Sequence, residues 1–361
     1  MDAIFFPRKD YDVVVCQHRL GKKMTYTDCT DQLQFQRSYD WITAYAKSKG
    51  IKLSFFGRYA EFPTQDFVNK ALPDLLSGHI WLDTYSYAPN IASKITGGGT
   101  ITQEEWNTAY NDYVGKEFIQ AVGKKPVALS YSYNNTTFAD FITQYLGGRK
   151  SGQSHNITSY GIGCGNPDNV PYSFESNKAL INTFQWWDEV VHGTSGVTFA
   201  EEIQIVANKI DETILNGGWI RNFTHYHSVY DSDTQPYEDY LDMLSAKNAN
   251  GEIYFSGYGE ALAYLVYRQL ITRAVMYSPN AKHSSQLVIR LEAHNTLGVD
   301  TDLLQIPISI KFSTVGTPLA GKNIASNCNL ISLGGGDYIV EIPYMGRFPY
   351  AIINEVKPLT E

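Results

Sequence analysis

Two kinds of hydrophobic pattern alternate over the first three quarters of the chain. Between about residue 11 and residue 270, short runs of β-branched and aromatic residues are separated by stretches in which apolar residues recur every three or four positions. This alternation is typical of βα units arranged around a parallel sheet. We therefore predict strands over residues 11–16, 24–27, 51–56, 79–82, 126–131, 218–224 and 252–255.

The segments between these runs carry helix signals. Phe35, Tyr39, Ile42 and Ala46 form one apolar stripe that stops at Gly50, as expected of an amphipathic helix with a glycine end. Two further segments begin with a threonine followed three residues later by glutamate, which is the pattern of a capping box. The predicted helices cover residues 35–46, 102–118, 180–191, 198–214, 236–247 and 257–272.

The pattern changes after residue 275. Apolar residues now alternate with polar ones along 287–291, 306–312 and 338–342, and turns rich in Gly, Asn and Pro separate these runs. A period of two residues indicates half-buried strands. We predict an α/β domain over residues 1–275, a linker over 275–284 and a small antiparallel, β-sandwich-like domain over 284–361.

The order of the segments between about residues 10 and 272 resembles the polysaccharide deacetylases, also called carbohydrate esterase family 4 or the NodB-homology family. The segments that carry this resemblance are Lys23–Cys29 (KMTYTDC), Gly50–Phe56 (GIKLSFF), Ser77–Ala88 (SGHIWLDTYSYA) and Gly218–His225 (GWIRNFTH). The resemblance implies a distorted (β/α)7-type barrel with its active site at the carboxyl ends of the strands.

The resemblance also implies a metal-dependent removal of acetyl groups from sugars. In that family one Asp and two His hold a divalent metal, and a second Asp acts as the general base. Asp28 falls on the metal-binding Asp, but Thr27 falls on the base, so Asp31 would have to replace it. Asp83 and Tyr87 fall on the two metal-binding His. The expected cofactor is therefore a divalent cation (Zn, Mn, Mg or Ca) in an altered site.

The late histidine of the family is matched by His225, which the resemblance makes the general acid. His227 lies two residues further on, so it would face the same side if the strand continued, and we treat it as a metal ligand beside Asp28 and Asp83. Aromatic side chains with a polar tip suit contacts with sugar rings. The candidate substrate-binding residues are Trp81, Tyr85, Tyr87, Tyr131 and Tyr133.

Two functional hypotheses follow. The chain is either a divergent deacetylase acting on acetylated carbohydrate, or a catalytically inactive descendant that binds carbohydrate or serves in an assembly such as a virion or a surface apparatus. The first predicts that Asp28, Asp83 and His225 converge around a cation, and the second predicts an aromatic-lined site without one. Whether the chain is an enzyme is left open, because fold does not fix function.

The composition of the chain excludes some classes of binding partner. A net charge of −8 without any run of basic residues argues against nucleic acid. We expect no signal peptide and no membrane span, and hence a cytoplasmic protein or part of a particle exported by another route. The four cysteines are scattered, which predicts free thiols. The C-terminal β domain could join copies of the chain or a larger assembly.

Overall fold

The computed structural model describes residues 9–30, 39–58, 64–85, 99–131, 145–150, 156–157, 181–184, 198–224, 234–279, 285–296 and 298–356. The chain divides into two compact units, one formed by Lys23–Ala263 and the other by Met1–Lys22 with Tyr264–Glu361. The sequence places the boundary at 275–284, whereas this division falls within a helix at residue 263 and assigns the first 22 residues to the second unit.

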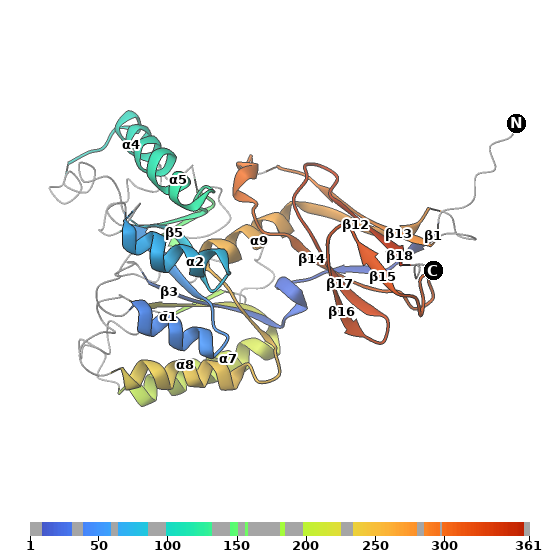
Figure 1. Cartoon of the computed structure of the whole chain (residues 1–361), viewed down its shortest axis with the longest axis horizontal. Helices are drawn as coiled ribbons and strands as arrows, with labels where there is room; N and C mark the ends of the chain where they lie inside the picture. Colours follow the sequence, from blue (N-terminus) through green and yellow to red (C-terminus); the bar gives the residue numbers. More distant parts are fainter. Residues whose placement is uncertain are drawn as a thin grey trace, which may run out of the picture. The chain divides into compact units, whose positions relative to one another are not determined.

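A largely parallel sheet forms the centre of the first unit (Figure 1). Its strands run in the order β8-β7-β6-β5-β4-β3-β10-β9, and β11 also pairs with the first half of β3. Every pair is parallel except β7 with β8. Among the described residues, no pairing between the two end strands, β8 and β9, closes the sheet into a barrel. The strands are β3 (Met24–Thr30), β4 (Leu53–Arg58), β5 (Ile80–Tyr85), β6 (Ala128–Tyr131), β7 (Gly147–Lys150), β8 (Asn156–Ile157), β9 (Ile181–Phe184), β10 (Gly218–Thr224) and β11 (Ile253–Phe255).

Helices cover this sheet and bury its apolar side chains. The predicted capping boxes at Thr102 and Thr198 are present, each with its reciprocal glutamate contact. The predicted α/β class with a parallel core is thus confirmed. The helical segments are α1 (Tyr39–Ser48), η3 (Phe67–Ala71), α2 (Leu72–Leu76), α4 (Gln103–Tyr110), the π-helical η4 (Asn111–Phe118), α5 (Ile119–Val122), α7 (Phe199–Asn216), α8 (Gln235–Lys247) and α9 (Tyr258–Leu270).

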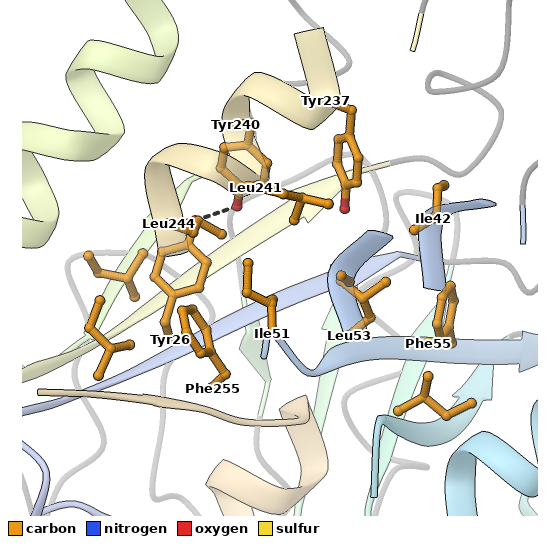
Figure 2. Close-up of a cluster of buried hydrophobic side chains, with 14 of the residues drawn as sticks. Tyr26, Ile42, Ile51, Leu53, Phe55, Tyr237, Tyr240, Leu241, Leu244 and Phe255 are labelled. Carbon is orange, nitrogen blue, oxygen red and sulfur yellow. Dashed lines mark hydrogen bonds between the residues drawn. The ribbon is translucent and has the colours of Figure 1, made fainter. Parts of the chain in front are cut away.

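One face of the sheet packs against α1, α7 and α8. Tyr26, Leu53 and Ile80 point from three strands into a core with Ile42 of α1 and Leu244 of α8. Figure 2 shows this layer of side chains between the strands and the helices. We call it the helix-covered face. The other face receives the first turn of α9, where the Tyr258 ring contacts Phe56 and Trp219.

One predicted element of this unit is wrong. The apolar spacing over 180–191 predicts a helix, but residues 181–184 form β9, which pairs in parallel with β10 from Trp219 to Asn222. The segment contains the β-branched residues Ile181 and Thr183, which suit a pleated strand. The apolar spacing that suggests a helix rests on only four positions, and the pairing of this segment with β10 makes it a strand instead.

The second unit consists of antiparallel strands in two sheets. The five-stranded sheet has the order β1-β12-β13-β18-β15 and the four-stranded sheet the order β16-β17-β14-β2. The antiparallel C-terminal β region is confirmed. Its strands are β1 (Lys9–Tyr11), β2 (Val13–Val15), β12 (Ile271–Ser278), β13 (Gln286–Ala293), β14 (Ile308–Ser313), β15 (Ile324–Ser326), β16 (Asn329–Gly334), β17 (Asp337–Ile342) and β18 (Tyr350–Glu355).

Two details of this unit differ from the sequence prediction. The run 11–16 is not a strand of the parallel sheet, because β1 pairs with β12 and β2 pairs with β14. The predicted linker begins inside β12, which continues to Ser278. Strands that pair across more than 250 residues of sequence leave no signal in a local pattern, which explains both differences.

Among the described residues, Cys16, Cys29 and Cys328 are free thiols, as predicted, and Cys164 lies outside them. None of the helices in the described part of the chain is both long and apolar enough to span a membrane.

Candidate functional site at the carboxyl edge of the sheet

The carboxyl ends of the parallel strands form the edge at which the resemblance places the site. β3 and β10 are paired along their whole length, so Thr30 and Thr224 end them side by side. The next residues along the chain are Asp31 after β3 and His225 after β10. Tyr87 and Tyr133 follow two residues after the ends of β5 and β6. Four predicted site positions thus come one or two residues after strands that end at one edge.

Most of the predicted site residues, including both predicted catalytic residues, lie outside the described part of the chain. This holds for Asp31, Tyr87, Tyr133, His225 and His227, and for the side chains of Tyr85 and Tyr131, which are the last residues of β5 and β6. Their roles stay predictions. Asp28, Asp83 and Trp81 are described in full.

Asp28 lies on the helix-covered face, beneath α8. It is 3% exposed, and it pairs in register with Asn222 of β10. The Tyr237 hydroxyl donates to Oδ2 (2.9 Å), and the Asn222 amide Nδ2 lies 3.3 Å from Oδ1. Burial raises the pKa of Asp28 to about 7, although the hydrogen bonds from Tyr237, Asn222 and Tyr240 act in the opposite direction.

The Asp28 carboxyl group belongs to a wider buried network. Asn222 also donates to the Tyr240 hydroxyl (2.8 Å), which lies 2.5 Å from the Tyr26 hydroxyl. Figure 2 shows Tyr26 reaching from β3 to Tyr240, with Tyr237 on the same helix. The network links β3, β10 and α8, so its evident role is to dock the helix on the sheet.

Asp83 lies on the opposite face and holds the start of α9. Its side chain is fully buried, and Oδ1 accepts from the backbone N–H groups of Val127 (2.9 Å) and Ala128 (3.0 Å). Oδ2 accepts from the Trp81 indole (2.8 Å) and from the Gly259 N–H (2.9 Å). Burial raises the pKa of Asp83 to about 6, against the lowering effect of these donors. Four donors occupy the roughly four acceptor positions of a carboxylate.

Strand register separates the two aspartates. Asp28 is paired with Leu53, and Leu53 with Ile80, so these three side chains share a face. Asp83 is three positions beyond Ile80, and neighbouring residues of a strand alternate between faces. Asp28 and Asp83 therefore point to opposite faces of the sheet.

These positions do not fit the predicted metal site. A shared cation needs ligands on one side of the sheet with free lone pairs, whereas Asp28 and Asp83 face apart and Asp83 has none to spare. Among the described residues, no three His, Cys, Asp or Glu side chains cluster in a way that could hold a metal. The structure therefore does not bring Asp28 and Asp83 together around one cation, and His227, the third predicted ligand, lies outside the described residues.

Trp81 is also buried and hydrogen-bonded within the fold. It is 6% exposed, donates to Asp83, and carries the Lys124 ammonium 3.7 Å from the centre of its ring. A Cβ atom added to Gly257 would lie 2.0 Å from the Trp81 side chain, so the backbone of that residue presses against it. The predicted stacking of Trp81 on sugar is therefore not available in this structure.

Several residues that accompany these aspartates are not among the candidates that the sequence predicts. Tyr237 and Tyr240 lie three positions apart on a predicted helix, a spacing that places them on one face of it. Arg221 is 7% exposed in β10, with its guanidinium 4.9 Å from the Trp219 ring. The sequence signal for Arg221 is a charged residue in the middle of a predicted strand. Thr27, at the position of the family's base, accepts the Trp219 indole N–H (2.9 Å).

No protein-family model matches the chain, and no curated protein matches it in sequence. Solved structures do match. A polysaccharide deacetylase from Mycobacterium smegmatis, described as putative, has a TM-score of 0.43 and 8% identity, covering 72% of this chain and 95% of that one. The Xyl-CE4 domain of a multidomain xylanase from the hindgut metagenome of Trinervitermes trinervoides has a TM-score of 0.40 and 11% identity, covering 66% and 89%.

A CE4 family pseudoenzyme from Bacillus anthracis also matches, with a TM-score of 0.34 and 12% identity, covering 67% of this chain and 66% of that one. The chain is thus similar in structure, at low identity, to CE4 polysaccharide deacetylases. At these identities the likeness concerns the fold alone.

Proposed function

We propose that the chain acts on or binds acetylated carbohydrate at the carboxyl edge of its parallel sheet. The observation that carries the proposal is the pairing of Thr30 with Thr224. It makes Asp31 and His225 the next residues of two hydrogen-bonded strands, at the edge where parallel α/β folds bind ligands. The sequence segments that resemble the deacetylases are also adjacent strands of one sheet, namely β3, β4, β5 and β10.

In this proposal Asp31 and His225 divide the proton transfers. Asp31, as a carboxylate, accepts a proton from the attacking water, and His225 donates a proton to the leaving nitrogen or oxygen of the sugar. His227, Tyr85, Tyr87, Tyr131 and Tyr133 are proposed to line the same edge. Asp28 and Asp83 have no part in the reaction, and no step is assigned to a metal held by them.

A second candidate function is carbohydrate binding or assembly without hydrolysis. It is favoured by the hydrogen bonds that hold Asp28 and Asp83 in the fold, together with Thr27 and Tyr87 at positions where the family has its general base and a metal ligand. A barrel that has lost these groups can keep a sugar-binding edge, or can serve in a virion or surface apparatus.

Acetate release and binding separate the two candidates. We would incubate the purified chain with acetylated xylan and with an N-acetylglucosamine pentamer, and measure acetate, binding and bound metal. The variants are Asp31→Asn and His225→Gln, with Asp28→Asn as a control that alters only the buried network. Acetate release that is lost in the first two and kept in the control supports catalysis.

Binding without acetate release, weakened in Asp31→Asn and His225→Gln, supports the second candidate. The proposal would be contradicted if the chain released no acetate from either glycan and bound neither of them. It would also be contradicted by activity that depends on Asp28 and on stoichiometric metal while surviving in His225→Gln.

A further inference from the structure

The five-stranded sheet of the second unit has one covered and one exposed face. Along β13, the buried Leu287, Ile289 and Leu291 alternate with the partly exposed Val288 and Arg290. Register with β12 and β18 places further side chains beside the exposed ones. We call this the Arg290 face; in register it carries Asp10, Arg273, Val275, Tyr277, Val288, Arg290, Glu292, Tyr350 and Ile352.

Two aromatic rings lie at one end of the Arg290 face. Tyr350 pairs with Arg290 in register. The chain before it continues along β13, because Leu291 donates to the Pro349 carbonyl (2.8 Å) and Ala293 to the Arg347 carbonyl (2.9 Å). Phe348 is therefore two positions from Tyr350 on the same face. The exposed fractions of Phe348, just before β18, and of Tyr350, its first residue, are 42% and 43%, which is high for large aromatic side chains.

Two arginines flank the Phe348 ring. The guanidinium carbon of Arg290 lies 4.3 Å from the centre of the Phe348 ring, and that of Arg347 lies 5.2 Å from it. Among the residues that the structure describes, no carboxylate forms an ion pair with either guanidinium. Arg19 in the same unit, by contrast, pairs with Glu341 at 2.7 Å. The chain as a whole carries a charge of −8, whereas these two arginines bring positive charge to one exposed ring.

We propose that the Arg290 face is a second binding surface, and that its ligand is a polysaccharide bearing carboxylate groups. The apolar side of a sugar ring can pack on Phe348 or Tyr350, as these rings are exposed and held by the sheet. The planar guanidinium groups of Arg290 and Arg347 match a carboxylate with two parallel hydrogen bonds. This inference is independent of the site proposed at the carboxyl edge of the parallel sheet.

A single-stranded nucleic acid could also stack on these rings. Its affinity would require several phosphates to be neutralised, and the acidic chain offers few cations here. The observations therefore favour the acidic polysaccharide, and nucleic acid becomes an outcome of the test.

The test is equilibrium binding of the full chain to polygalacturonate, measured at low and moderate salt, with neutral dextran and oligo-dT as comparison ligands. The informative variants are the double substitution Arg290→Gln with Arg347→Gln, and Phe348→Ala. The matched control is Lys116→Gln with Lys209→Gln, which removes two surface charges from the other unit. Circular dichroism checks that every variant is folded.

We expect wild type to bind polygalacturonate with at least tenfold preference over dextran and oligo-dT. Both informative variants should lose at least tenfold in affinity, and the control should stay within twofold of wild type. The proposal is overturned if wild type does not bind, if dextran or oligo-dT binds equally well, or if the lysine control loses as much as the arginine variant.

Discussion

Asp28 and Asp83 sit on strands of the same sheet and point to opposite faces of it. Asp28 joins a tyrosine network under α8, and Asp83 accepts four N–H groups, one of which is that of Gly259 in the first turn of α9. Each aspartate therefore fastens a different helix to the sheet. Two positions that sequence comparison would place in one metal site instead serve the fold on its two sides.

The buried Asp28 carboxyl makes stability depend on pH. Its folded pKa is raised to about 7 from 3.8, so the folded state holds a proton that the unfolded state releases between these values. Stability therefore falls as pH rises from 3.8 to 7, by on the order of 4 kcal/mol. Asp28→Asn should remove this loss, so the stability of the variant relative to wild type should increase as pH rises.

Urea denaturation at pH 5 and pH 8 checks this prediction. All six tryptophans lie between residues 41 and 219, so their fluorescence reports on the unit that contains Asp28. Asp83 titrates in both proteins, and its contribution cancels in the difference. A variant whose stability relative to wild type is the same at both pH values would contradict the buried, proton-holding Asp28.

Asp83→Asn should destabilise the first unit strongly. In the wild type, backbone N–H groups donate to both oxygens of the Asp83 carboxylate. The asparagine side chain has an NH₂ group in place of one oxygen, and this group cannot accept from those donors, so buried N–H groups are left without an acceptor. The expected loss is about 3 kcal/mol. The matched control is Asp112→Asn, an exposed carboxylate paired with Lys116, which should cost less than about 1 kcal/mol. Equal effects of the two substitutions on the fluorescence transition would refute the role given to Asp83.

Trp81→Phe distinguishes packing from sugar binding. The substitution removes the indole donor to Asp83 and weakens the contact with the Lys124 ammonium. We expect a loss of about 1–3 kcal/mol in unfolding free energy, with affinity for acetylated glycan within twofold of wild type. Tenfold weaker binding in a variant of unchanged stability would restore Trp81 as a stacking platform.

His18 should make the second unit sensitive to acid. It is 3% exposed, and burial, together with the nearby Arg268 charge, lowers its pKa to about 3 from 6.5. The unfolded chain binds this proton first as pH falls, so stability drops between pH 6.5 and pH 3, by on the order of 5 kcal/mol. His18→Gln should flatten this drop in thermal unfolding followed by circular dichroism. A variant with the same acid dependence as wild type would contradict the prediction.

The sequence predicted those parts of the fold that depend on local pattern. The strand over 218–224 and the capping boxes at Thr102 and Thr198 appear as predicted, since periodicity and cap chemistry are encoded within a few residues. β1 was missed because its partner lies more than 250 residues away in sequence, and β9 because its apolar spacing matched a helix.

The candidate site was predicted less well than the fold. The motif order placed Asp28, Asp83 and Trp81 near the carboxyl edge, but it could not say which face each side chain takes. A shift of one residue along a strand moves a side chain to the other face. Register and hydrogen-bond partners decide this, and both appear only in three dimensions.

The most direct test of the account is the affinity of Asp28→Asn and of His225→Gln for an N-acetylglucosamine pentamer and for acetylated xylan. We predict that Asp28→Asn binds within twofold of wild type, and that His225→Gln binds at least tenfold more weakly. Tenfold weaker binding in Asp28→Asn, with His225→Gln unchanged, would place the site at Asp28 and contradict the account.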